Sequence, residues 1–144
     1  MSAHISYCTF SLGGRQFGIE VGTVREVVRD QAVTPVPLAP AAVTGLVNLR
    51  GRIISAIDLR HCLGLERARP GQAGTLIVLR ESLGDVSFIV DEIHDVCDAD
   101  PESFEATPPT AKGVGHPLIR GAHKLSDRLL LLLDVTKALD AAGA

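Results

Sequence analysis

Short stretches of alternating apolar and polar residues, separated by glycine turns, restrict the fold of this chain more than any other feature. In the first stretch Cys8, Phe10 and Leu12 alternate with polar neighbours, and residues 17–21 alternate in the same way. Gly13-Gly14 between them supplies the positive φ angles of a tight turn. Since successive side chains of a strand point to opposite faces, this pattern predicts a β-hairpin and a mainly β chain.

A second hairpin is predicted from residues 45–49 and 53–57, with Arg50-Gly51-Arg52 as its turn. Asp58 follows the second strand directly, at the position of a helix N-cap. The pattern therefore predicts a short helix from Asp58 to Leu63, closed by Gly64.

A similar order of elements follows residue 74. Apolar runs at 76–79 and 86–90 predict two strands, and 118–125 with 128–133 predict a final hairpin. Asp134 then stands at the N-cap of a C-terminal helix with apolar residues at helical spacing.

Two intervening segments have their own patterns. Val24, Val27 and Val28 are spaced i, i+3 and i+4, which favours a single helical turn entering an extended segment. Residues 66–74 are polar and contain one proline and two glycines, which is typical of a linker.

The two parts of the chain align as an internal repeat. A shift of 69 positions aligns Val24 with Ile93, and a shift of 76 aligns Gly45 with Gly121. Identity is low and the offset changes, so chance agreement is the alternative. We favour a single domain over residues 1–144 made of two pseudo-repeat halves, about 7–65 and 75–139, because a half of that size is marginally stable alone.

Composition excludes several classes of protein. The chain has 144 residues, 46% of them hydrophobic, and a net charge of −3, which excludes disorder. No apolar run approaches the ~20 residues of a membrane span, and the N-terminus does not resemble a signal peptide. Five aromatic residues without tryptophan, and no uncompensated basic stripe, argue against nucleic-acid binding. We therefore expect a cytoplasmic protein with no direct membrane insertion.

Motifs for catalysis, cofactors and metals are missing from the sequence. The glycines at 13–18 lack the Lys-Ser/Thr of a phosphate-binding loop, and no Gly-x-Ser-x-Gly elbow occurs. The three cysteines, Cys8, Cys62 and Cys97, match no disulfide or zinc spacing, and His61-Cys62 has no second pair to complete a tetrahedral site. We predict no catalytic residue, cofactor or metal.

Charge is unevenly distributed along the chain. Residues 81–105 contain nine acidic residues and no lysine or arginine. Such a run usually forms a solvated face, although it could also steer a basic partner. Arg50 and Arg52 flank Gly51 at a predicted hairpin tip, where they either add solubility or present a rigidly held guanidinium for anchoring at an interface.

Residues 45–60, Gly-Leu-Val-Asn-Leu-Arg-Gly-Arg-Ile-Ile-Ser-Ala-Ile-Asp-Leu-Arg, closely resemble CheW, the coupling protein of bacterial chemotaxis. The similarity continues through the opening Phe-x-Leu-Gly-Gly hairpin, Val90-Asp91 and Ile119 to Asp134. It implies two SH3-like five-stranded β-barrels with a groove between them, in agreement with the internal repeat.

The resemblance also implies a non-enzymatic role. CheW proteins connect the cytoplasmic tips of transmembrane chemoreceptors to the regulatory domain of the histidine kinase CheA, without a cofactor. By motif, the implied receptor-facing groove contains Val24, Glu26, Val27, Gly45, Arg50 and Ile93. An apolar groove of this kind suits a receptor helix, and Val24 and Ile93 are expected to face each other across the seam. The residues that contact the kinase are not assigned.

Two positions depart from the family pattern. Ser55 stands where proline is usual, and Ser87 replaces the usual glycine. These departures leave open a CheW-like coupler of a pilus-motility or other non-flagellar kinase pathway. A small-molecule-binding or catalytic domain on the same barrels is a more remote alternative.

Overall fold

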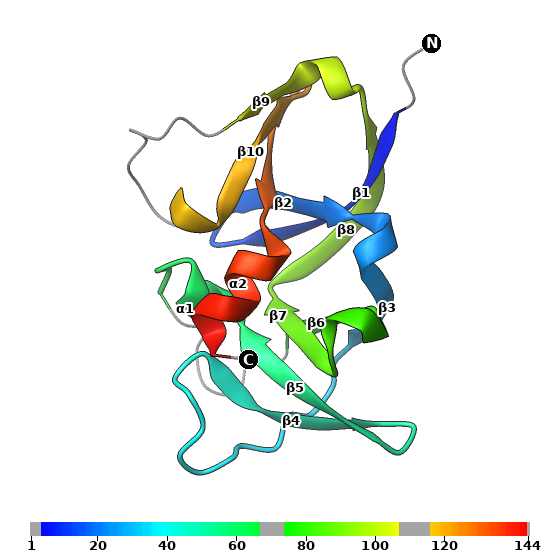
Figure 1. Cartoon of the computed structure of the whole chain (residues 1–144). Coiled ribbons are helices and arrows are strands. Elements are labelled where there is room, and N and C mark those ends of the chain that lie inside the picture. The colour runs from blue at the N-terminus through cyan, green and yellow to red at the C-terminus, as the bar shows by residue number, and fades with distance from the viewer. Residues whose placement is uncertain (1–3, 67–73, 107–115, 144) are drawn as a thin grey trace.

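The structure, a computed structural model, describes residues 4–66, 74–106 and 116–143. Two β-sheets and several short helical segments make up this part of the chain (Figure 1). Most of the predicted linker at 66–74 lies outside the described residues.

Sheet A has six strands in the order β8-β1-β2-β11-β10-β9. Its strands are β1 (Ile5–Leu12), β2 (Arg15–Glu20), β8 (Glu92–Ala99), β9 (Phe104–Ala106), β10 (Ile119–Lys124) and β11 (Leu129–Leu133). The predicted hairpins β1–β2 and β10–β11 are both confirmed as antiparallel pairs.

Sheet B has five strands in the order β3-β6-β7-β5-β4. Its strands are β3 (Val24–Arg29), β4 (Val43–Leu49), β5 (Arg52–Asp58), β6 (Thr75–Leu79) and β7 (Val86–Val90). The predicted hairpin β4–β5 is confirmed.

Both sheets combine strands from the two parts of the sequence. The hairpin β1–β2 lies in sheet A with β8 to β11, whereas β6 and β7 lie in sheet B with β3 to β5. One parallel pairing in each sheet makes the junction, β2 with β11 and β5 with β7. The mainly β class is confirmed, and among the described residues the sheets are open, with β8 and β9 as the edges of one and β3 and β4 as the edges of the other.

Helical segments connect the strands. They are η1 (Val21–Thr23), α1 (Leu59–Cys62), η2 (Glu81–Leu83), η3 (Pro101–Ser103), η4 (His116–Leu118) and α2 (Val135–Ala142). Both predicted N-caps are confirmed: the Asp58 carboxylate accepts the backbone N–H of Arg60, and the Asp134 carboxylate accepts that of Lys137.

The helical turn predicted at Val24, Val27 and Val28 lies earlier, at Val21–Thr23, and the extended segment predicted after it is confirmed as β3. A 3-10 turn ends at Thr23, and all three valines lie in β3, which pairs with β6. β-branched residues favour strands, and pairing with the fully buried β6 overrides the helical spacing. As a result Val27 is exposed, Val24 is half-buried against the main core, and Val28 is half-buried against a separate cluster that contains Leu76.

The two family departures lie side by side at the parallel junction of β5 and β7. The Ser55 N–H donates to the carbonyl of Asp85 at 2.9 Å, a bond that proline could not make. The buried Ser87 hydroxyl donates to the carbonyl of Ser55 at 3.0 Å. Both serines therefore replace the usual residues with hydrogen bonds that strengthen this junction.

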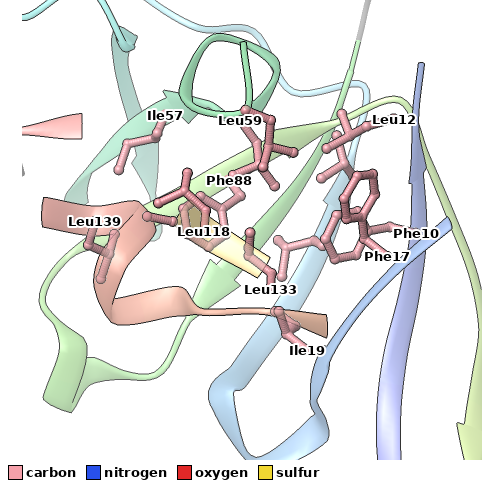
Figure 2. Close-up of a cluster of buried hydrophobic side chains, with 14 of the residues drawn as sticks. Phe10, Leu12, Phe17, Ile19, Ile57, Leu59, Phe88, Leu118, Leu133 and Leu139 are labelled. Atoms are coloured by element: carbon pink, nitrogen blue, oxygen red, sulfur yellow. The ribbon is translucent and has the colours of Figure 1, made fainter. Parts of the chain in front are cut away.

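The main core lies between the sheets and is covered by α1 and α2 (Figure 2). The rings of Phe10 and Phe17 stack with centroids 5.9 Å apart. Phe88 from sheet B, Leu59 from α1 and Leu139 from α2 point into the same cluster. Both sheets therefore contribute side chains to one core.

Candidate partner-binding surface

The turn between β4 and β5 has a tightly defined backbone. Arg50 and Gly51 both have positive φ angles, 50° and 83°, as a two-residue type I′ hairpin turn requires. The side-chain oxygen of Asn48 accepts the N–H of Gly51 at 3.1 Å. This geometry fixes the point from which the Arg50 side chain leaves the hairpin.

Arg50 forms a two-bond ion pair with Glu26 of β3. Nη1 lies 2.7 Å from Oε1 and Nη2 lies 2.8 Å from Oε2. The Arg50 side chain is 74% exposed and that of Glu26 22% exposed. The hydrogen bond from Arg50 lowers the pKa of Glu26, so the carboxylate stays ionised near neutral pH.

A second cluster holds the neighbouring arginine. Arg52 donates to Glu81, and its Nη2 lies 2.6 Å from Oδ1 of Asp85. Arg25 on β3 reaches the same Glu81 at 3.2 Å. The Arg52 guanidinium is therefore occupied by Glu81 and Asp85. Arg50 is the arginine that projects from the turn between β4 and β5.

Val24 and Ile93 occupy corresponding places in the two sheets. Val24 lies on edge strand β3 opposite Leu79, and Ile93 lies on edge strand β8 opposite Phe10. Both are half-buried and pack against the main core cluster. Their facing each other across a groove stays a prediction. The structure brings Glu26 and Arg50 together through their ion pair, and Val24 and Val27 lie on the same strand as Glu26.

Gly45 contributes through its backbone. It is buried, and a Cβ atom there would collide with the carbonyl oxygen of Thr34, whose strand segment pairs with Leu46. Gly121 in sheet A has the same relation to the carbonyl oxygen of Glu105 in β9. Each glycine admits the close approach of an additional strand segment, so the role of Gly45 shown by the structure is in the pairing of Thr34 with β4.

Sequence reasoning missed an ion pair between the sheets. Arg60 of α1 binds Asp91 through Nε at 2.8 Å and Nη2 at 2.5 Å, and the N–H of Gly13 donates to the same carboxylate at 3.0 Å. Burial raises the pKa of Asp91, but the bonds from Arg60 and Gly13 outweigh it and lower the pKa below its usual value. The Val-Asp motif marked the position of Asp91 without indicating its partner.

The acidic run at 81–105 is largely occupied by internal contacts. Six of its nine carboxylates accept hydrogen bonds or ion pairs; these are Glu81, Asp85, Asp91, Asp98, Asp100 and Glu105. In the described part of the chain, Glu92, Asp95 and Glu102 are the carboxylates of the run that have no such partner. Ion pairs neutralise Glu81, Asp85, Asp91 and Glu105, whereas hydrogen bonds leave Asp98 and Asp100 charged, so the run keeps part of its negative charge and the steering of a basic partner stays a prediction.

A buried histidine forms the other notable polar cluster. His123 contacts the Tyr7 hydroxyl through Nε2 at 3.0 Å and the Ser103 hydroxyl through Nδ1 at 2.7 Å. Burial lowers the pKa of His123, which favours the neutral ring, although Asp100 acts in the opposite direction. The Ser103 hydroxyl also lies 2.8 Å from the carbonyl oxygen of Asp100, so Ser103 connects His123 to the turn at η3.

Two negative findings apply to the described residues. They contain no group of three or more His, Cys, Asp or Glu side chains placed to hold a metal ion. None of the helices found among them is long and apolar enough to cross a membrane.

Comparison with known proteins identifies the family. The CheW-like domain model matches residues 6–143. The chemotaxis protein CheW of Treponema pallidum is 32% identical over 133 residues, covering 90% of this chain and 78% of that protein. Protein PilI of Pseudomonas aeruginosa is 29% identical over 112 residues, covering 78% and 63%. The crystal structure of the scaffolding protein TtCheW from Thermoanaerobacter tengcongensis aligns with a TM-score of 0.81 at 28% identity, covering 91% of this chain and 89% of that one. The chain therefore belongs to the CheW-like domain family.

Proposed function

We propose that this protein is a non-enzymatic adaptor that couples transmembrane chemoreceptors to a CheA-type histidine kinase. Membership of the CheW-like family supports this role. The observation that carries the proposal is the Glu26–Arg50 ion pair, which holds a largely exposed guanidinium beside the valines of β3. The proposal implies a cytoplasmic protein recruited to membrane-anchored receptors.

The surface combines an apolar strip with an oriented donor. Val27 is exposed and Val24 is half-buried on the same strand, so a helix of the receptor tip could cover apolar area there. Arg50 directs two of its five N–H groups at Glu26. The pairing restricts the rotation of the side chain, and the remaining donors can reach an acceptor on the receptor at a lower entropic cost.

The test is quantitative binding of wild type and R50A to receptor-containing membranes and to the full-length kinase. We expect R50A to bind receptor about 10- to 150-fold more weakly, the range for loss of a charge-assisted hydrogen bond. Arg15→Ala is the matched control, because Arg15 is also an exposed arginine beside a hairpin turn, but lies in sheet A. Undiminished binding of both partners by R50A would overturn this use of the surface.

A second candidate retains the adaptor role in another pathway. Similarity to Protein PilI supports a coupler for a pilus-motility or other non-flagellar kinase. Genes for flagellar receptors and kinase beside this gene would favour the first candidate, and pilus genes would favour the second.

A further inference from the structure

The internal repeat places a polar pair in sheet A where sheet B has an apolar pair. The shift of 76 positions aligns His123 of β10 with Val47 of β4, and the shift of 69 aligns Tyr7 of β1 with Leu76 of β6. The residues that lie opposite His123 and Val47 in the following strands are also 76 positions apart. All four residues of the two pairs are no more than 3% exposed. A titratable ring is therefore buried in one sheet at a place that is apolar in the other.

The neighbours of His123 determine which of its nitrogens carries a proton. The Ser103 hydroxyl lies 2.7 Å from Nδ1 of the ring and 2.8 Å from the carbonyl oxygen of Asp100. A carbonyl oxygen only accepts, so both contacts are hydrogen bonds when Ser103 donates to Asp100 and Nδ1–H donates to Ser103. The lone pair of Nε2 then accepts the Tyr7 hydroxyl at 3.0 Å. The cluster is therefore fully bonded around a neutral ring that carries its proton on Nδ1.

A second proton on the ring disrupts these bonds. Nε2–H no longer accepts, and Tyr7 could accept from it only by turning its own proton away. Within the described residues the Tyr7 hydroxyl has no second hydrogen-bond partner. Burial raises the pKa of Tyr7, so the hydroxyl keeps its proton at neutral pH. Protonation of His123 therefore leaves a buried donor without an acceptor, in addition to the cost of burying the charge.

The charged groups around the ring offset this cost only in part. Burial lowers the pKa of His123 and the charge of Asp100 raises it, with burial the larger effect. The other charged residues either line a cavity of about 130 Å³ beside the ring or adjoin His123 and Phe104 in sequence; they are Glu20, Arg120, Lys124 and Glu105. All four are exposed, Glu20 and Arg120 have opposite charges, and Lys124 pairs with Glu105 at 3.0 Å. The neutral ring is therefore favoured, and the cavity gives protons from solvent a route to it.

The ring connects parts of sheet A that are not neighbours. Strands β2 and β11 lie between β1 and β10, so the bond between Tyr7 and His123 spans two intervening strands. The turn η3 connects the two edge strands β8 and β9, and Ser103 bonds this turn to the ring (Figure 1). β9 has three residues and pairs only with β10. Short edge elements open at a low free energy, so η3 and β9 are the first parts to respond when the ring loses its bonds.

We propose that His123 is a pH-sensitive switch, which holds η3 and β9 on sheet A while it is neutral and releases them when it is protonated. The release is confined to sheet A, because Val47 and Leu76 at the equivalent place in sheet B do not titrate. This inference goes beyond the adaptor role and does not depend on any partner. Mild acid would loosen one sheet of the protein and leave the Glu26–Arg50 pair on the other sheet in place.

The test is hydrogen exchange of the full chain at pH 6.5 and 5.5, corrected for the intrinsic exchange rate at each pH. In the open segment His123 has its ordinary pKa of about 6.5 and binds the proton more strongly than in the closed one, so opening increases as pH falls. We expect the protection of residues 102–106 to fall about three- to tenfold over this interval, and that of residues 43–58 to stay constant. Tyr7→Phe removes the donor that favours the neutral ring, so the same loss should begin at higher pH.

His123→Gln is the decisive variant, because glutamine offers both a donor and an acceptor but does not titrate in this range. His94→Gln is the matched control, since His94 is an exposed histidine on β8 of the same sheet. A pH-dependent loss of protection in wild type and H94Q that is absent from H123Q supports the proposal. The same loss in H123Q, or constant protection in wild type, overturns it.

A measurement on wild type alone decides the matter if H123Q does not fold. Nuclear magnetic resonance of the ring nitrogens should show His123 protonated on Nδ1 at pH 7.5 and titrating below the ordinary histidine value of about 6.5. A neutral ring protonated on Nε2, or titration at or above that value, overturns the switch.

Discussion

Two arginine–carboxylate pairs, each joined by two hydrogen bonds, lie in contrasting environments. Arg60 and Asp91 are mostly buried, with side chains 18% and 25% exposed, whereas Arg50 is 74% exposed beside Glu26. Each pair has two hydrogen bonds, from Nε and Nη2 of Arg60 and from Nη1 and Nη2 of Arg50. The difference in exposure, rather than the bonding, separates a structural pair from one that a partner can reach.

The buried pair joins segments that meet only in the folded chain. Asp91 lies between β7 of sheet B and β8 of sheet A, and its carboxylate also accepts the N–H of Gly13 in the β1–β2 turn. Arg60 additionally donates to the carbonyl of Glu66 at 2.8 Å. Removal of either charge would leave the other partly buried and unpaired, which costs more than the pair itself contributes.

Asp91→Ala tests the structural half of this comparison and has the largest expected effect. We expect a loss of about 2–3 kcal/mol in the free energy of unfolding, because Arg60 and the Gly13 N–H both lose their acceptor in a partly buried site. Urea denaturation measures it. Glu92→Ala is the control, since this adjacent carboxylate is exposed, and it should change stability by less than about 0.5 kcal/mol. A similar effect of both substitutions would contradict the structural role.

The pH dependence of stability tests the Asp91 ion pair in a second way. The folded-state pKa of Asp91 is lowered, so its contribution is fully present above the unfolded value of about 3.9 and is lost as pH falls through the folded value. Wild-type stability should therefore decline below about pH 5, and Asp91→Asn should flatten part of that decline. Thermal melts between pH 3 and 7 measure the difference. Equal slopes for wild type and Asp91→Asn would show that the ion pair does not contribute to acid sensitivity.

Local chemistry made the hairpins and helix starts predictable. Gly13-Gly14 and the caps Asp58 and Asp134 act on neighbours within a few residues, so the sequence alone locates them. The valine spacing of β3 misled the prediction because contact with β6, about fifty residues later, decides its conformation. Long-range pairing was therefore the main source of error.

The site was predictable in its residues but less so in its contacts. The family motif located Glu26 and Arg50, yet their mutual ion pair depends on the packing of β3 beside the β4–β5 turn. The partners of Arg52 and Arg60 lie about thirty residues away, and no local pattern connects them.

The Glu26–Arg50 pair should contribute little to stability. Its removal therefore has the smallest of the expected effects. We expect R50A and Glu26→Gln each to lower the melting temperature by no more than about 2 °C, because solvent and salt screen the guanidinium of Arg50, which is 74% exposed. Differential scanning calorimetry at low and high salt measures the change, and the small difference from wild type should shrink further at high salt. The same two variants are expected to weaken receptor binding, so the comparison predicts a large effect on affinity beside a small one on stability. A melting temperature lowered as much as in Asp91→Ala would make Glu26–Arg50 a structural pair and would remove the distinction between the two.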